Sequence, residues 1–214
     1  VHGHGGTVIV ALALKILHND VGCSYHPNSW GERFHWYSST GWVMWNAQVS
    51  GLLNGTTCVL YDGNPGGARD QPDWTTLWRF AAETGVTFFG AGAAFYANCQ
   101  KAGVDLSTCG DLSRIRALGS TGSPLSEDAQ RWGTEQFRRV RDAAGERGGD
   151  RSPAGPPQGG SAPSGGSGPR EAGERGGDIW WCNISGGTDF AGAFIGGNRE
   201  LPQVPGRMQC RLLG

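Results

Sequence analysis

The sequence has no excess of charge of either sign. Its formal net charge is −1 over 214 residues, so it offers no electrostatic basis for binding nucleic acid or an anionic membrane surface. No run reaches the roughly 18 consecutive apolar residues that a membrane-spanning helix needs. The first residues contain neither an initiator Met nor a basic stretch before an apolar run, so no signal peptide is expected. These absences favour a cytoplasmic protein whose partners are small molecules, with no nucleic acid and no membrane among them.

Paired cysteine motifs are also missing. None of the six cysteines belongs to a C-x-x-C pair, and several lie in apolar runs: Cys23, Cys58, Cys99, Cys109, Cys182 and Cys210. This pattern indicates reduced thiols rather than a disulfide framework or a zinc site. The phosphate-binding motifs G-x-x-x-x-G-K-[ST] and G-x-G-x-x-G are absent as well. The sequence therefore supports neither a P-loop NTPase nor a dinucleotide-binding enzyme of the classical kind.

Short apolar strands and helices alternate along the chain. This alternation predicts a single α/β domain with a mainly parallel sheet and flanking helices. Because parallel strands are covered on both faces, continuous apolar runs are expected in them. The helix at 7–18 is apolar at nearly every position and is expected to be largely buried. Expected helices lie at 7–18, 40–53, 73–84, 93–101 and 124–141, and expected strands at 33–38, 56–61, 86–89, 115–118 and from 179 onward.

The segment 141–178 departs from this pattern. It consists mainly of Gly, Pro, Ser, Arg and Glu, and the sequence 145–150 recurs at 173–178. Such a composition buries too little apolar surface to offset the entropy of ordering, so disorder is expected. A tandem duplication or translated non-coding sequence would produce the repeat, and a functional tether is the alternative. The domain is therefore expected to comprise residues 1–140 and 179–214, interrupted by this insert.

The stretch 179–189 is the strongest candidate for a site. It begins as a buried strand and ends in Ser185-Gly186-Gly187-Thr188-Asp189. The glycines permit close backbone approach to a ligand, the threonine hydroxyl can donate to a phosphate oxygen, and the aspartate can hold a divalent cation. A glycine-rich turn after a core strand is the alternative interpretation.

A second polar turn, 119–124, follows the strand expected at 115–118. The carboxyl ends of parallel strands meet at one edge of a sheet. If the two strands are near neighbours, the two turns form a slot for a flat base, a phosphate and a metal ion.

The chain resembles the acetoacetyl-CoA synthetases (acetoacetate–CoA ligases) of the adenylate-forming acyl-CoA synthetase superfamily. The resemblance covers about residues 1–140 and 179–214, which would be an internal fragment of the large AMP-binding domain of that fold. Five segments carry it in order: Thr40–Asn46, Val59–Gly63, Leu118–Pro124, Ile184–Asp189 and Gln209–Gly214. The Ser-Gly-Gly-Thr-Asp form, with Gly-Trp-Val-Met-Trp-Asn upstream, points to the acetoacetate branch rather than the acetate branch.

The resemblance implies a defined chemistry. A carboxylate attacks the α-phosphate of ATP to give an acyl-adenylate, and the thiol of CoA then displaces AMP. Thr188 would contact the α-phosphate and Asp189 would ligate Mg²⁺, which makes these two the catalytic candidates. Gly122, Ser123 and Pro124 match the segment lining one side of the adenine pocket, and Ser185, Gly186 and Gly187 match the other. Trp42 and Met44 match positions bordering the acyl pocket, where bulky walls would exclude long chains; a plain core role is the alternative for them.

Other parts of such a ligase are expected outside this chain. A phosphate-binding loop would precede Val1, and the ribose-binding aspartate and catalytic lysine would follow Gly214. The chain by itself is therefore expected to be inactive. Two alternatives remain open at this point: a non-catalytic nucleotide-binding fragment, and another short-chain acyl-CoA synthetase.

Overall fold

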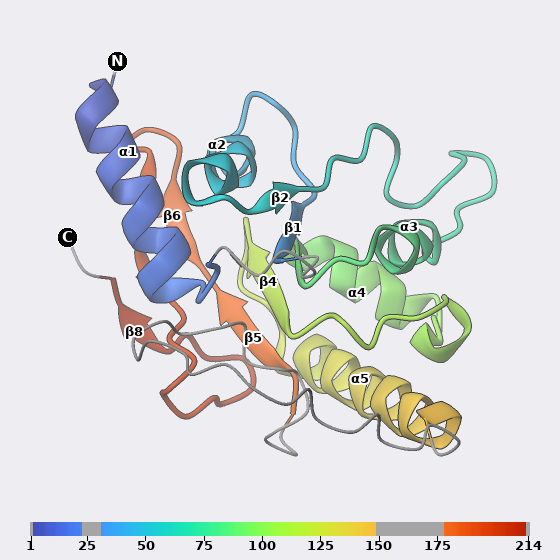
Figure 1. The fold of residues 1–214 in the computed structure, drawn as a ribbon. Helices are drawn as coiled ribbons and strands as arrows, with labels where there is room; N and C mark the ends of the chain where they lie inside the picture. Colours follow the sequence, from blue (N-terminus) through green and yellow to red (C-terminus); the bar gives the residue numbers. More distant parts are fainter. Residues whose placement is uncertain (1, 23–30, 149–177, 213–214) are drawn as a thin grey trace, which may run out of the picture.

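The computed structural model describes residues 2–22, 31–148 and 178–212. Figure 1 shows their arrangement. The order of elements is α1 (His4–Ala13), η1 (Leu14–His18), β1 (Arg33–Trp36), α2 (Val43–Val49), η2 (Ser50–Asn54), β2 (Thr57–Cys58), α3 (Thr76–Thr84), β3 (Phe88–Gly92), α4 (Ala93–Lys101), η3 (Leu106–Thr108), β4 (Ala117–Thr121), α5 (Glu127–Gly148), β5 (Trp180–Asn183), β6 (Ser185–Gly187), β7 (Gly192–Gly196) and β8 (Cys210–Arg211).

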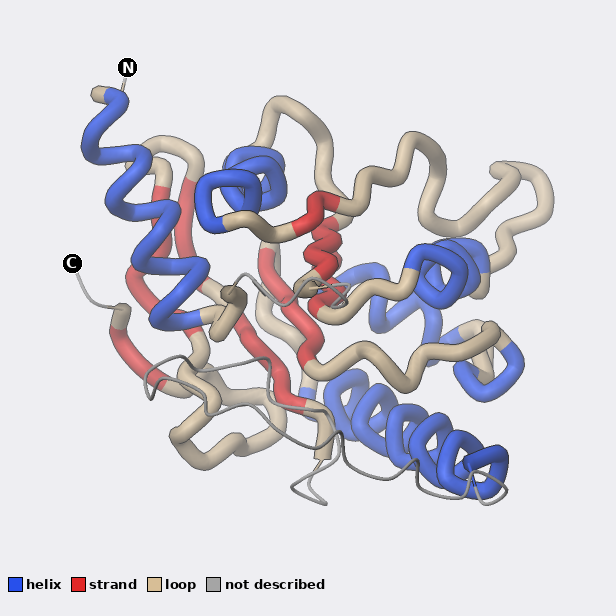
Figure 2. The backbone as a smooth tube through the Cα atoms, in the orientation of Figure 1, coloured by secondary structure: helices blue, strands red, loops and turns tan. Residues whose placement is uncertain are grey.

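The expected parallel sheet with flanking helices is confirmed. Five strands pair in the order β2-β1-β3-β4-β5, and every pairing among them is parallel. A second, antiparallel sheet has the order β6-β7-β8 and was not expected from the sequence. Figure 2 shows both groups of strands, with the helices beside the larger sheet.

Helices cover both faces of the parallel sheet. On one face, α3, α4 and α5 bury aromatic side chains such as Trp78, Tyr96 and Phe137 against the strands. On the other face, α2 packs Met44 against Phe34 and Trp180. Coverage of both faces explains why the strands read as continuous apolar runs in the sequence. The carboxyl ends of the strands therefore remain as the open edge at which polar groups can gather.

The first helix is less buried than its sequence predicts. None of the residues of α1 is buried, and the side chain of Ile9 is 69% exposed. The expectation of a largely buried helix is therefore wrong. The reason is its position: α1 stands beside the layers formed by α2 and the sheets (Figure 1), so only one side of it meets the rest of the chain.

The last long helix begins later and ends later than expected. It starts at Glu127 rather than at residue 124, and the hydroxyl oxygen of Ser126 accepts from the amide of Ala129 at 3.2 Å. It runs to Gly148, so residues 141–148 are helical rather than disordered. Asp178, at the other end of the expected insert, pairs with Arg138 at 2.6 Å. The expectation of disorder for 149–177 lies outside the described residues.

Candidate functional site

The two candidate turns follow neighbouring strands. β4 and β5 pair in parallel register from Ala117↔Trp180 to Ser120↔Asn183. Beyond this register, the Thr121 hydroxyl donates to the Ile184 carbonyl at 2.7 Å, and the Ile184 amide donates to the Ser120 carbonyl at 2.8 Å. The segments that begin at Gly122 and Ser185 thus leave the same edge of the sheet. This arrangement is the one that the sequence predicts.

The segment Ser185–Gly187 is a strand rather than a turn. As β6 it pairs antiparallel with β7, with Gly186 opposite Ala193 and Gly187 opposite Gly192. A Cβ at Gly186 would lie 2.2 Å from the carbonyl oxygen of Gly192. The close approach of two strands therefore requires this glycine, whatever else lies nearby. The turn itself is formed by residues 188–191, where the Ala191 amide donates to the Thr188 carbonyl at 3.1 Å.

Thr188 links this turn to the start of α2. The backbone amide of Val43 donates to the Thr188 hydroxyl oxygen at 3.3 Å. Val43 is the first residue of α2, whose amide has no partner within its own helix. Since the hydroxyl oxygen accepts this bond, its own proton remains available to a ligand oxygen. Thr188 is exposed, as the position of such a donor requires.

Asp189 follows Thr188 at the tip of the same turn, and its side chain is exposed. Among the described residues, no group of three or more His, Cys, Asp or Glu side chains could hold a metal ion. This donor set does not suit a metal held by protein ligands alone. It does suit Mg²⁺, which proteins commonly hold through one or two carboxylates together with substrate phosphates and water.

Gly122 lies against Trp42. A Cβ at Gly122 would be 3.4 Å from the Trp42 ring, and the φ angle of this glycine is +89°. Ser123 and Pro124 follow in the exposed loop between β4 and α5. The structure therefore brings Gly122, Trp42 and, through Val43, Thr188 into one neighbourhood. Ser123 and Pro124 extend from it toward solvent.

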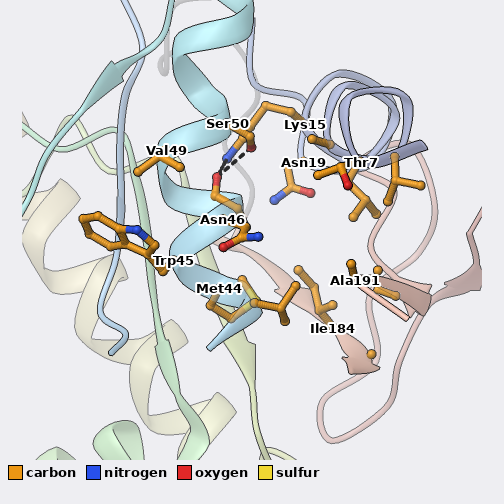
Figure 3. Close-up of a pocket in the computed structure, with 18 of the residues that line it drawn as sticks. Thr7, Lys15, Asn19, Met44, Trp45, Asn46, Val49, Ser50, Ile184 and Ala191 are labelled. Carbon is orange, nitrogen blue, oxygen red and sulfur yellow. Dashed lines mark hydrogen bonds between the residues drawn. The ribbon is translucent and has the colours of Figure 1, made fainter. Parts of the chain in front are cut away.

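A cavity of about 900 Å³ opens beside this group (Figure 3). Trp42, Met44, Gly122 and Gly186 are all part of its lining, as are Thr121 and Ile184. Met44 is 7% exposed, so it packs in the core beneath α2 and also reaches the cavity lining. Four candidate residues from three separate segments thus share one cavity.

The far wall of the cavity was missed by sequence reasoning. It is formed by α1 and η1, which contribute Thr7, Val10, Ala11, Leu14, Lys15 and Asn19. The apolar sequence of this helix does not predict the placement, because a helix that packs in a core and a helix that lines a cavity have the same pattern of apolar residues. Lys15, which interrupts this apolar run, is the one sequence feature that could have indicated a polar cavity wall here.

Lys15 is the charged residue of the lining. Its ammonium group donates to the Ala47 carbonyl at 2.7 Å and lies 3.1 Å from the centroid of the Phe34 ring. The side chain is 2% exposed. Burial, which disfavours the charged form, lowers the pKa of Lys15 from 10.5 to about 7. The hydrogen bond of Lys15 therefore links η1 to α2. With a pKa of about 7, the side chain is close to half protonated near neutral pH.

Cys182 lies on β5, close to the site in sequence. It is completely buried, and burial raises the pKa of its thiol to about 12. A thiol that stays protonated is a small apolar side chain rather than a nucleophile. The described cysteines, which are Cys58, Cys99, Cys109, Cys182 and Cys210, form no disulfide with one another. No described helix has both the length and the apolar character to cross a membrane.

Comparison with known proteins supports the resemblance seen in the motifs. No family model matches the chain. The chain is 28% identical to the acetoacetyl-CoA synthetase of Danio rerio and 31% identical to that of Rhizobium meliloti, each over 214 residues. It spans about a quarter of the length of these curated relatives: 24% of the first and 25% of the second.

Two solved structures of CoA ligases and synthetases are also similar to the chain. The acetoacetyl-CoA synthetase from Streptomyces lividans matches 98% of this chain and 25% of its own, with a TM-score of 0.70 and 38% identity. An anthranilate CoA ligase in complex with anthranoyl-AMP matches 96% of this chain with a TM-score of 0.64 and 15% identity. The second likeness shows the fold alone.

Proposed function

We propose that this chain, which is related over its whole length to a part of the acetoacetyl-CoA synthetases, forms part of the nucleotide- and acyl-binding domain of an ATP-dependent acid–CoA ligase. The observation that carries the proposal is the meeting of Thr188, Gly122 and the Trp42–Val43 segment at one sheet edge, beside a large cavity. A nucleotide phosphate at the edge and an acyl group in the cavity would then be neighbours.

The reaction has two steps. A carboxylate oxygen of the acid bonds to the α-phosphorus of ATP, and the bond to pyrophosphate breaks. The sulfur of CoA then bonds to the acyl carbon, its proton is lost, and AMP departs with the electrons of the broken bond. Both steps place growing negative charge on oxygen, which fixed hydrogen-bond donors stabilise.

The residues of this chain would contribute in three ways. The hydroxyl of Thr188 would donate to a non-bridging oxygen of the α-phosphate. Asp189 would hold Mg²⁺, which supplies neutralisation of phosphate charge when bound. The backbone at Ser185–Gly187 and at Gly122, Ser123 and Pro124 would border the base of the nucleotide.

The acid would occupy the cavity against Trp42 and Met44. Acetoacetate is the favoured substrate, because the relatives that match over the whole chain bear the name acetoacetyl-CoA synthetase. The cavity volume favours a second candidate. A site of about 900 Å³ lies at the upper end of the range for ligand pockets and exceeds the space that a four-carbon acid fills. A larger acid, or acetoacetate together with part of CoA, would fill it better.

The test is thioester formation by the complete protein encoded by the gene that carries this chain. We expect release of pyrophosphate and formation of acetoacetyl-CoA when ATP, Mg²⁺, CoA and acetoacetate are supplied together. A panel of short and medium acids decides between the two candidates. If no acid is activated but AMP binds, the chain is a nucleotide-binding fragment without catalysis. The 214-residue chain alone should form no thioester, and accumulation of product would contradict that expectation.

A further inference from the structure

The cavity wall formed by η1 carries a polar group with no protein partner. The side chain of Asn19 is 5% exposed, lines the cavity and has an amide oxygen, Oδ1, without a hydrogen bond. Figure 3 shows this amide in the space between α2 and the helix of η1. A buried polar atom left unpaired destabilises the fold. Asn19 Oδ1 is one of six such atoms among the described residues, and Asn19 is the one of these six residues that lines the cavity, where a ligand could pair with it.

The position of Asn19 is fixed by its backbone. Its amide donates to the Leu14 carbonyl at 2.8 Å and closes the π-helical turn of η1. π-Helical turns are rare and are frequent at functional sites. The next amide but one, that of Val21, donates to the Lys15 carbonyl at 2.9 Å. The turn therefore holds Asn19 at the wall rather than leaving it free to turn away.

The other polar groups of this wall are already engaged. The Lys15 ammonium binds the Ala47 carbonyl, which also accepts from the Ser50 hydroxyl at 2.9 Å. The Thr7 hydroxyl donates to the Gly3 carbonyl at 3.1 Å. The surrounding surface is mostly apolar, with Val10, Leu14 and Met44 among the lining residues. Asn19 is the buried residue of this wall with a side-chain atom, Oδ1, that has no hydrogen-bond partner, and it offers a ligand an acceptor as well as donors.

We propose that Asn19 determines specificity by binding an oxygen substituent on the carbon chain of the acid, so that keto or hydroxy acids are preferred over unsubstituted acids of equal length. This inference rests on the proposed function. A primary amide presents an acceptor and two donors, so it pairs with a hydroxyl through Oδ1 and with a keto oxygen through Nδ2. An unsubstituted acid would cover the amide and leave it unpaired. A site that forms a hydrogen bond with one substrate discriminates strongly against an analogue that lacks the bonding group.

The decisive measurement is a ratio. For the complete protein we compare kcat/KM for acetoacetate and for butyrate, which has the same chain length and lacks the keto oxygen. Replacing Asn19 by Leu keeps the size and removes the amide. We expect Asn19→Leu to reduce the acetoacetate-to-butyrate ratio by roughly tenfold or more. Asn98→Leu, on α4 across the sheet, is the matched control and should leave the ratio unchanged.

A second variant separates the two pairing modes. Because both kcat/KM values of a ratio are measured on the same preparation, the ratio does not depend on the fraction of protein that is folded. Asn19→Asp retains the acceptor oxygens and removes the donors. It should shift preference from acetoacetate toward 3-hydroxybutyrate, whose hydroxyl can donate to a carboxylate. An unchanged ratio in both Asn19 variants, with activity retained, would overturn the inference and leave the ligase assignment standing.

A binding measurement keeps the inference testable if the complete protein activates no acid. Saturation-transfer NMR on the 214-residue chain reports binding of acetoacetate, 3-hydroxybutyrate and butyrate directly. The oxygenated acids should bind more tightly than butyrate, and the difference should disappear in Asn19→Leu. Equal binding of the three acids by the unaltered chain would refute the role of Asn19. Absence of activity, by contrast, would refute only the proposed function.

Discussion

Replacing Lys15 by Met should change how the stability of the chain depends on pH. The side chain is 2% exposed, and burial lowers its pKa from 10.5 to about 7. Below pH ~7 both the folded and the unfolded chain carry the proton, so folding bears the full cost of burying the charge. Between pH ~7 and ~10.5 the unfolded chain binds more protons than the folded one, so the free energy of unfolding rises with pH.

The expected size follows from the two pKa values. Each unit of difference corresponds to about 1.4 kcal/mol, and the lysine is half neutral at the start of the window. From pH ~7 to ~8.5 the free energy of unfolding of the unaltered chain should therefore rise by about 1.5 kcal/mol relative to that of Lys15→Met. The comparison with Lys15→Met is needed because burial also raises the pKa of Cys99 and Cys182 to about 12. Ionisation of these thiols in the unfolded state lowers the stability of both proteins at higher pH, and this contribution cancels in the difference between them.

The assay is urea denaturation of the two proteins at several pH values. Lost packing of the Lys15 methylene chain changes the stability of Lys15→Met by an amount that does not depend on pH, so the slope of the difference is the informative quantity. Lys101→Met is the control. Lys101 is exposed at the end of α4, so its replacement should leave the slope unaltered. A stability difference between the unaltered chain and Lys15→Met that stays flat, or falls, from pH ~7 to ~8.5 would refute the reasoning.

Three further predictions concern the sheet edge. Gly186→Ala should destabilise the chain by about 2 kcal/mol or more, because its Cβ would meet a backbone carbonyl at 2.2 Å; Gly187→Ala should cost less in thermal denaturation, since its Cβ meets only the movable ring of Phe190 at 3.0 Å. Thr188→Val in the complete protein should lower kcat about 10²-fold, as loss of one charge-stabilising donor does. The same change should alter stability by less than about 1 kcal/mol in urea titrations, because the residue is exposed. Asp189→Asn should raise the Mg²⁺ concentration for half-maximal pyrophosphate release about tenfold, or ~1.4 kcal/mol, and an unchanged Mg²⁺ requirement would remove this residue from the metal site.

The parallel core was predictable because its signals are local. Ala93–Lys101 is helical over the whole expected range, and Gly85 ends α3 with a φ of +64°, as a C-terminal glycine does. The placement of both candidate turns at one edge followed from a general property of parallel sheets, once β4 and β5 proved to be neighbours. The local sequence signals of helices and strands and the general geometry of parallel sheets therefore predict the same arrangement.

The antiparallel hairpin β6–β7 was not predictable from local preference. Its strands are Ser185–Gly187 and Gly192–Gly196, and glycine disfavours strands. The hairpin exists because glycine permits a backbone approach that any side chain would block. A sequence pattern can mark such glycines as required, but it cannot say whether a ligand or another strand makes them so. In this fold the partner of Gly186 is Ala193 and its neighbour Gly192.

Thr188 shows why the site cannot be reduced to its motif. Its hydroxyl oxygen accepts the first amide of α2, a bond across 145 positions of the sequence. Because the oxygen accepts this bond, the hydroxyl proton remains free to be donated elsewhere. It also joins the residue proposed to bind phosphate to the helix that carries Trp42 and Met44 at the cavity. A shift of α2 on binding an acid would therefore move the donor proposed for the phosphate. In the proposed reaction, positioning of the acid and stabilisation of the phosphate would then be coupled through a single hydrogen bond.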